Sequence, residues 1–419
     1  MKERIILLLL AVSSILVGCT ESNSDEAFER PSEIPILLNV SGSFSADATV
    51  KESAPATRAS INTIDELDKV GIYCLAGRKT GINGSDQAKD PDWNVTLGSG
   101  AAYATSTHGI YWNNLSCSVS SSVDGEKARL TVDAGQDYVW YYPITSWYAY
   151  DFYGYHPYDE NVVKCSIQPY DNGKKHKIVA DIVIDGKQDI LWGRSVKKQV
   201  GVNDENDINK YAYSARYFRN SSETAVQMEF KHCLCMFEFY IQPQEKNETP
   251  DANLNSYKDL SVKKITMHRV KKNLTMTLAD SGTEGGVGVV NPKNDGVVFD
   301  AVLCNRDGNE ITPVPFWDEE KGFDEPVRVG DCIMVCPGEV AYNMSMVICH
   351  NDTNEEFYSE KEMTIKLANG ALFEPGKKYK VYIKATGVTA IAVEAIVEDW
   401  EDYTKEDGEL DENLNFDID

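Results

Sequence analysis

Short runs in which apolar and polar residues alternate recur along most of the chain, whereas long apolar stripes with a helical spacing are scarce. The runs are rich in Val, Ile, Tyr and Phe, and turn-forming clusters such as Asp171-Asn172-Gly173 separate them. Because successive side chains of a strand point to opposite faces, this alternation predicts strands with one buried face. The chain is therefore expected to be an all-β protein of the antiparallel sandwich or barrel class. Strands are predicted within 70–75, 128–132, 178–184, 226–241, 260–267, 273–278, 331–335, 344–349, 378–383 and 391–397.

Length and composition indicate two folded domains. The 419 residues exceed what one hydrophobic core usually serves, since single cores stop growing at roughly 250 to 300 residues. With 42% hydrophobic residues, the chain can form substantial cores. Linker-like composition around Ser221 predicts one β-sandwich at 59–220 and a second at 221–403. Residues 19–58 precede them as a tether with one strand, and residues 404–419 follow as an acidic tail.

The first residues are typical of an export signal, which we place at 1–18. Lys2 and Arg4 form a basic start, an apolar run follows, and Leu16-Val17-Gly18-Cys19 ends it. The run is too short to span a membrane comfortably as a helix. The Leu-Val-Gly-Cys motif resembles the bacterial lipobox, which implies cleavage before Cys19 and acylation of its thiol and new amino terminus. An ordinary secretory signal followed by a chance cysteine is the alternative.

The charge balance argues against nucleic acid as a partner. Asp and Glu number 66 against 41 Lys and Arg, which gives a formal net charge of −25. Such a charge repels phosphate backbones and anionic lipid surfaces. The lipobox resemblance, together with the short apolar run, implies that a lipid on Cys19, rather than a transmembrane helix, anchors the protein to the membrane.

No motif in the sequence predicts a metal site, a cofactor or an enzymatic reaction. His232, Cys233 and Cys235 lie in one predicted strand, where alternation places both cysteines on one face and the histidine on the other, so they cannot easily share a zinc ion. The sequence contains neither a Gly-x-Ser-x-Gly nucleophile elbow nor a His-Glu-x-x-His motif. Nine cysteines remain apart from Cys19, and those inside apolar runs, such as Cys74, fit small buried hydrophobes better than disulfides.

An aromatic stretch at 138–158 offers a candidate binding surface. It holds eleven aromatic residues in 21 positions. Flat rings with polar tips, such as Trp147 and Tyr155, could stack on the sugar rings of a host glycan. Alternating aromatics in a sandwich strand mostly fill the core, however, and this interpretation is favoured for most of them.

Several short motifs occur in an order that resembles the fimbrillin-like (Mfa-like) lipoproteins of Bacteroidales, the subunits of donor-strand (type V) pili and their accessory proteins. The resemblance covers nearly the whole chain. It rests on Cys19, Ala56-Thr57-Arg58-Ala59-Ser60, Val70-Gly71-Ile72-Tyr73, the aromatic stretch through Tyr155-His156-Pro157-Tyr158, Asp189-Ile190-Leu191-Trp192-Gly193, Val226 to Leu234, Pro375-Gly376-Lys377-Lys378-Tyr379 and a final strand that ends at Trp400.

This resemblance implies a fold and a way of assembly. The fold would be two tandem transthyretin-like β-sandwich domains of the Greek-key type. The protein would be exported with a lipid to the outer membrane, lose an N-terminal strand by cleavage after an arginine, and join other fimbrial subunits by strand exchange.

The residues before Arg58 independently suggest a removable strand. Ile36, Leu38, Val40 and, after a glycine, Phe44 alternate with mostly polar positions, which suits a strand with one buried face. Arg58 lies in a small, polar linker of the kind that proteases cut readily. Loss of the strand would leave an apolar groove with unpaired backbone edges. The strand could instead be permanent, as in a capping or anchoring protein, and cleavage at Arg30 would leave it in place.

The tail supplies a candidate donor strand. Leu414, Phe416 and Ile418 alternate with Asn and Asp in a strict period of two. Inserted between the edges of a neighbouring subunit, they would add a strand whose main-chain bonds give affinity and whose side chains set the register. The tail could instead complete the sheet of its own domain, or be disordered with a chance alternation.

The sequence therefore predicts a fimbrial subunit or pilus-associated adhesin, located at the outer membrane or in the fimbrium. Its expected partners are other fimbrial subunits, with a host glycan or protein as a further possibility. The alternative is a monomeric surface lipoprotein that binds a glycan or host protein. The sequence leaves open whether the role is that of stalk, tip, anchor or regulator.

Overall fold

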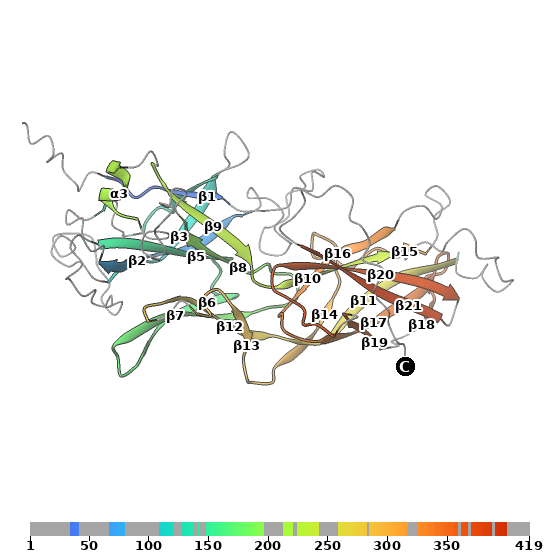
Figure 1. Ribbon diagram of the computed structural model, residues 1–419. Helices are drawn as coiled ribbons and strands as arrows, with labels where there is room; N and C mark the ends of the chain where they lie inside the picture. Colours follow the sequence, from blue (N-terminus) through green and yellow to red (C-terminus); the bar gives the residue numbers. More distant parts are fainter. Residues whose placement is uncertain are drawn as a thin grey trace, which may run out of the picture.

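The computed structural model describes residues 34–41, 67–79, 109–120, 128–136, 141–142, 148–196, 213–220, 224–242, 259–282, 285–316, 326–358, 362–367, 370–387 and 390–399. Nearly all regular structure in these ranges is strand, which confirms the predicted all-β class. The strands form four sheets in an elongated molecule, with the N-terminal strands at one end and the C-terminal strands at the other (Figure 1). Among the described residues, no helix is long and apolar enough to cross a membrane.

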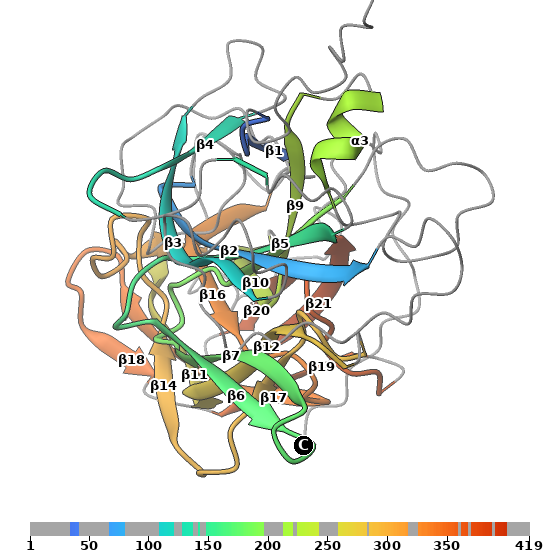
Figure 2. The ribbon, with the colours of Figure 1, turned by 90° about the vertical axis from the view of Figure 1, so that its left-hand side faces the viewer.

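Seven strands between residues 38 and 232 close into a barrel in the order β1-β4-β3-β2-β5-β8-β9. Its strands are β1 (Leu38–Ser41), β2 (Lys69–Lys79), β3 (Ile110–Ser120), β4 (Ala128–Val132), β5 (Tyr148–His156), β8 (Leu191–Ser195) and β9 (Val226–His232). A short helix, α3 (Ala215–Asn220), lies beside the barrel (Figure 2). The Ser214 hydroxyl caps this helix by accepting the Tyr217 backbone N–H at 3.2 Å.

The predicted strand at 226–241 is two strands that belong to different sheets. β9 ends at His232 in the barrel, and β10 (Cys235–Ile241) begins the C-terminal sandwich. Because Cys233 and Leu234 interrupt the ladder, the period of two does not run through them. The prediction that Cys233 and Cys235 share a face is therefore wrong. The two cysteines pack into two different hydrophobic clusters.

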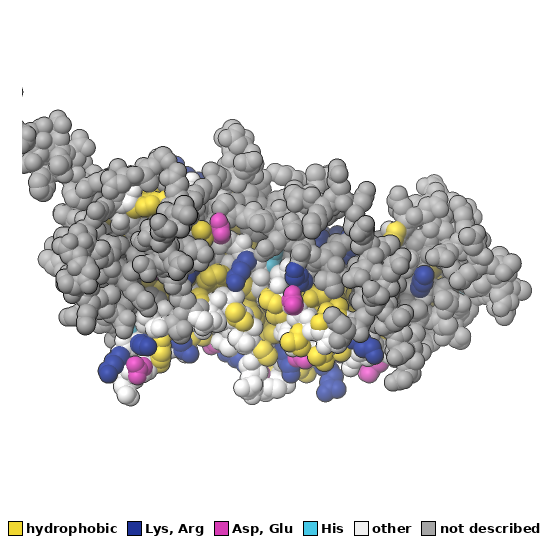
Figure 3. All heavy atoms as spheres, in the orientation of Figure 1, with side chains coloured by type: hydrophobic (Ala, Val, Ile, Leu, Met, Phe, Trp, Pro, Cys, Tyr) yellow, Lys and Arg dark blue, Asp and Glu magenta, His cyan; other side chains and the backbone are white. Residues whose placement is uncertain are grey.

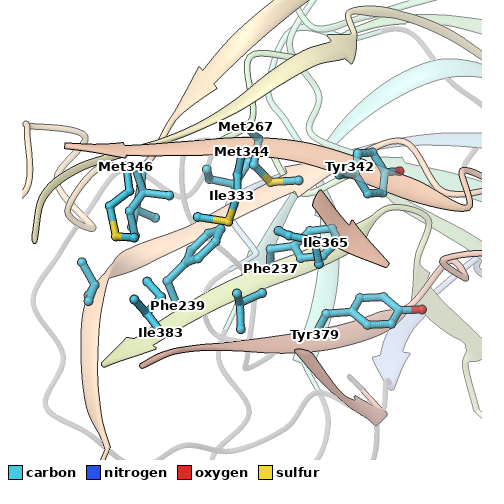
Figure 4. Packing of buried hydrophobic residues seen from close by; sticks show 14 of the residues in the cluster. Phe237, Phe239, Met267, Ile333, Tyr342, Met344, Met346, Ile365, Tyr379 and Ile383 are labelled. Carbon is cyan, nitrogen blue, oxygen red and sulfur yellow. The ribbon is translucent and has the colours of Figure 1, made fainter. Parts of the chain in front are cut away.

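Two sheets form the C-terminal sandwich. One has the order β16-β10-β20-β21, and the other has the order β14-β11-β17-β18, with β15 paired to β11 and β19 to β17. Their side chains face one another across a core in which Phe237, Phe239 and Met344 are fully buried (Figure 4). The strands are β11 (Leu260–Lys271), β14 (Val298–Val302), β15 (Val314–Pro315), β16 (Val327–Val335), β17 (Ala341–His350), β18 (Glu356–Tyr358), β19 (Met363–Lys366), β20 (Lys377–Gly387) and β21 (Ala390–Asp399).

A fourth sheet joins strands from both halves of the chain. Its order is β13-β12-β7-β6, where β6 (Val163–Tyr170) and β7 (Lys175–Val183) come from the N-terminal half and β12 (Asn273–Asp280) and β13 (Val290–Pro292) from the C-terminal half. We call it the bridging sheet. Beneath it lies a hydrophobic cluster that includes Tyr153 of the barrel, Met276 of β12 and Met334 of β16. This cluster packs the barrel, the bridging sheet and the sandwich against one another.

The described surface and the cysteines fit this architecture. Hydrophobic side chains gather in the middle of one face, in the region of β12, β13 and β14 (Figure 3). Val289, Val297 and Val298 are among the exposed hydrophobic residues of the described part. All nine described cysteines are free, and most of them are buried, which agrees with their interpretation as small hydrophobes.

Candidate functional site

β1 closes the barrel. It pairs antiparallel with β4, where Leu38 faces Leu130, and parallel with β9, where Leu38 faces Val226. Since β4 and β9 bond to β3 and β8 on their other sides, β1 is the strand that connects their remaining edges. Removing β1 would leave both edges without a ladder partner.

The segment that contains β1 has one buried face over residues 36–40, which agrees with the predicted alternation of this part. Ile36, Leu38 and Val40 are 8%, 2% and 0% exposed, whereas Leu37 and Asn39 between them are half-buried. The buried residues belong to the barrel core. This segment therefore fills a slot in the barrel with three apolar side chains spaced two residues apart.

Backbone hydrogen bonds extend beyond the ladder of β1. The Val226 N–H donates to the Leu37 carbonyl at 2.8 Å, and the Tyr142 N–H donates to the Ile34 carbonyl at 3.1 Å. Pro35 and Tyr141 form an isolated bridge next to the latter bond. The segment is thus held from residue 34 onward, not only over its four strand residues.

Aromatic residues line the barrel core near the start of this segment. The Tyr111 and Tyr150 rings are 4.3 Å apart, and Tyr142 packs on Tyr150 at 6.2 Å and on Phe218 of α3 at 5.6 Å. Burial is the main cause that raises the pKa of Tyr142, followed by the nearby Cys74 and Tyr213. The phenol therefore stays neutral, and the side chains that pack with the buried face of the segment are apolar or aromatic.

The other predicted site residues divide into two groups. Tyr155 is 2% exposed, and its hydroxyl donates to Asn114 Oδ1 at 2.8 Å. Burial, followed by the neighbouring Cys165, raises the pKa of Tyr155. This placement favours core filling over sugar stacking for Tyr155. The remaining predicted residues lie outside the described residues: Cys19, Phe44, Arg58, Trp147, Leu414, Phe416 and Ile418.

The structure also contains two polar clusters that the sequence did not indicate. In the first, both carboxylate oxygens of Asp189 lie near His232 Nδ1, at 2.9 and 3.1 Å, and the Asp189 carbonyl lies 3.3 Å from His156 Nδ1. All three residues are buried where the barrel meets the rest of the molecule. Burial lowers the pKa of His156 to about 4, so its ring is neutral at pH 7.

The second cluster joins three strands of the sandwich. His268 of β11 lies 2.6 Å from Ser345 Oγ through Nε2 and 3.2 Å from Asp300 Oδ2 through Nδ1. This order of groups resembles a Ser-His-Asp triad, but Ser345 is only 3% exposed, so its hydroxyl is not accessible to a substrate. The cluster instead fixes the orientation of the His268 ring. Within the described residues, no group of three or more His, Cys, Asp or Glu is arranged to hold a metal ion.

Comparison with solved structures finds proteins of low sequence identity. A protein assigned to cell adhesion from Bacteroides uniformis ATCC 8492 has 15% identity and a TM-score of 0.43, over 87% of this chain and 98% of that one. The fimbrial anchor protein Mfa2 from Porphyromonas gingivalis has 9% identity and a TM-score of 0.29, over 87% and 98%. A protein assigned as an adhesin from Bacteroides ovatus has 10% identity and a TM-score of 0.31, over 86% and 92%.

Comparison with protein families gives a result that does not depend on these structures. No curated protein matches the chain. The model of the fimbrillin-like family, however, matches residues 57–400, which is well over half of the sequence. The chain therefore belongs to the fimbrillin-like family.

Proposed function

We propose that this protein is a fimbrial subunit or pilus-associated adhesin that assembles by exchanging β1 for a strand of a neighbouring subunit. Membership of the fimbrillin-like family makes it a structural protein, not an enzyme, and indicates a surface or fimbrial location and assembly with other fimbrial subunits. The proposal adds export as a lipoprotein acylated at Cys19, cleavage after Arg58 and strand donation. The observation that carries it is that, among the described strands, β1 is the one that connects β4 with β9.

Cleavage after Arg58 would separate β1 covalently from the rest of the barrel. Every other barrel strand follows Arg58 in the sequence, and only β1 precedes it. The freed segment would then be held by noncovalent contacts alone. Removal of the segment, rather than local rearrangement, is what opens the slot.

The contacts of β1 are strong enough that a replacement strand is required. Burial of Ile36, Leu38 and Val40 stabilises the barrel by roughly 5 to 9 kcal/mol, at about 1.5 to 3 kcal/mol for each side chain. Each ladder hydrogen bond adds roughly 0.5 to 1.5 kcal/mol. A strand that forms equivalent contacts would offset this loss, whereas water would not.

The segment with Leu414, Phe416 and Ile418 has the pattern that such a replacement needs. Its three apolar residues have the same spacing of two as Ile36 and the buried residues after it. Phe416, at the central position, is larger than the leucine at the centre of the buried set. The slot would therefore need to widen there, which makes Phe416 the residue most sensitive to the shape of the acceptor.

Surface-shed material tests the proposal. Mass spectrometry should find the mature N-terminus at Ala59, and SDS-resistant ladders should appear on gels of the unheated protein. Arg58→Ala should retain the N-terminus at Cys19 and abolish the ladders, whereas the matched control Arg30→Ala should have no effect. Deletion of Leu414 to Asp419 should abolish the ladders without changing the N-terminus.

Each part of the proposal has its own contrary result. Ladders that persist after the deletion exclude the tail as the donor. A wild-type N-terminus that stays at Cys19 contradicts a role as a strand-exchanging stalk subunit and favours a permanent β1.

A further inference from the structure

A small pocket opens in the sandwich where β11 separates from β17. The β11–β17 ladder ends at the pair His268 and Asn343. Beyond it, Val270 and Lys271 pair only with β14, while β17 pairs with β19 through Ala341. The resulting cavity has a volume of about 170 Å³.

A β-bulge shapes the wall of this pocket. On β14, Ala301 faces Met267 and Phe299 faces Val270, so Asp300 opposes both His268 and Arg269. Arg269 adopts a positive φ of 57°, which is uncommon for a residue other than glycine, and its N–H donates to Asp300 Oδ1 at 3.0 Å. The other oxygen of Asp300 holds the His268 ring. One carboxylate thus fixes both the bulge and the imidazole.

The lining of the pocket combines cations with groups that accept hydrogen bonds. His268, Arg269 and Lys271 come from β11, Asn343 comes from β17, and Glu339 precedes β17. Within the described part of the chain, neither Arg269 nor Lys271 is in an ion pair. The protein has a net charge of −25, so two positively charged side chains without an ion-pair partner beside one cavity are unusual for its surface.

Two residues of the pocket lining are neutral. Tyr342 and Cys336 contribute to the lining, and the Tyr342 hydroxyl donates to the Cys336 carbonyl. Figure 4 shows this hydroxyl directed away from the other labelled side chains of the sandwich core. Burial raises the pKa of the Cys336 thiol to about 12, so it carries no charge at pH 7. The charge in the pocket therefore comes from Arg269 and Lys271 on β11 and from Glu339 before β17.

We propose that this pocket binds a single acidic sugar residue, with its carboxylate on Arg269 and Lys271 and its hydroxyl groups on Glu339 and Asn343. Arginine and lysine together suit a carboxylate, because the planar guanidinium can bind both of its oxygens and the ammonium adds a point charge. Glu339 accepts hydrogen bonds from hydroxyl groups but repels a bare anion. A ligand that has both an anionic group and hydroxyl donors therefore matches this lining better than phosphate does.

The size of the pocket limits the ligand to about one sugar ring. Its volume of about 170 Å³ lies below the roughly 300 to 1,000 Å³ of pockets that enclose drug-sized ligands. The site lies in the sandwich, away from the slot of β1, so it does not depend on strand exchange. It would give the protein a binding function in addition to assembly.

Titration of the full exported chain with two matched probes tests this site. Methyl glucuronide should bind saturably in the millimolar range, and methyl glucoside, which lacks the carboxylate, should not. Arg269→Gln and Lys271→Gln should each weaken glucuronide binding roughly tenfold, through loss of a charge-assisted hydrogen bond. Lys264→Gln is the matched control, because Lys264 is an exposed lysine on the same strand outside the pocket lining, and it should leave the affinity unchanged.

Circular dichroism should confirm that all variants remain folded. Equal binding of glucoside and glucuronide would overturn the role of the carboxylate. Phosphate that binds as tightly as glucuronide would identify a general anion site and contradict the assignment to a sugar. Absence of saturable glucuronide binding, or an equal loss in Lys264→Gln, would overturn the proposal as a whole.

Discussion

Leu38 and Leu130 face each other across the β1–β4 ladder. Replacing each of them with alanine should affect the stability of the precursor and of the assembled form differently. Both side chains are buried in the barrel core, at 2% and 6% exposure. Replacing a buried leucine with alanine typically lowers the free energy of unfolding by about 2 to 5 kcal/mol. In the uncleaved precursor, both substitutions should therefore destabilise the barrel by a similar amount.

After cleavage and strand exchange the two variants should differ. Under the proposed strand exchange, Leu38 leaves with the removed segment, so Leu38→Ala should have no effect on the stability of the polymer. Leu130 remains in the acceptor, so Leu130→Ala should still destabilise it by about 2 to 5 kcal/mol. The same chemical change in one cross-strand pair thus reports whether β1 is still present.

Urea unfolding followed by tryptophan fluorescence measures this difference. Trp112 is 2% exposed and lies in the same cluster as Leu38, so its emission reports on the barrel. With a denaturant dependence of a few kcal/mol per molar, the expected destabilisation shifts the midpoint by roughly 1 M. A polymer of Leu38→Ala that is weakened as much as one of Leu130→Ala would refute strand removal. If Leu38→Ala leaves the free energy of unfolding of the precursor unchanged, the packing of β1 in the barrel is refuted.

Three further predictions concern the fold. Gly193→Ala should lower the free energy of unfolding by about 1 to 3 kcal/mol, measured by urea unfolding, because an added Cβ would lie 2.8 Å from the Phe230 ring. Burial lowers the pKa of His156 to about 4, against roughly 6.5 in an unfolded chain, so the unfolded state binds more protons between these values. Stability should therefore rise by up to about 3 kcal/mol from pH 4 to pH 6.5, and a folded His156→Gln variant should lack this part of the rise. Met276→Ala should destabilise the barrel and the sandwich together by about 2 to 5 kcal/mol, because Met276 is 1% exposed in the cluster that joins them. Calorimetry, combined with fluorescence that reports separately on the barrel and on the sandwich, measures this. Unfolding of only one of the two at lower stability would contradict the prediction.

The buried face of β1 could be predicted from the sequence because a period of two is a local property. Ile36, Leu38 and Val40 reveal it without reference to any partner strand. The identity of the partners could not be predicted in this way. That β1 lies between β4 and β9 depends on contacts with residues that are distant in the sequence.

The residues around the sandwich pocket are even harder to predict from the sequence. His268, Asp300 and Ser345 come from three strands, and their meeting depends on the register of each pair. The bulge at Arg269 exists because Asp300 opposes two residues of β11, which alternation along one strand cannot reveal. The break at Cys233 cannot be predicted from the sequence for a related reason, since the apolar run continues through the point where the chain changes sheets.

The bridging sheet has a mechanical consequence for a fibre under flow. The β7–β12 ladder extends from the pair Val183 and Asn273 to the pair Lys177 and Asp280, so pulling the halves of one subunit apart requires this whole row of bonds to break. The cluster beneath the sheet would have to be exposed to water in the same event. A subunit in a stretched pilus would therefore carry tension as a single stiff link, and extension would have to come from the joints between subunits.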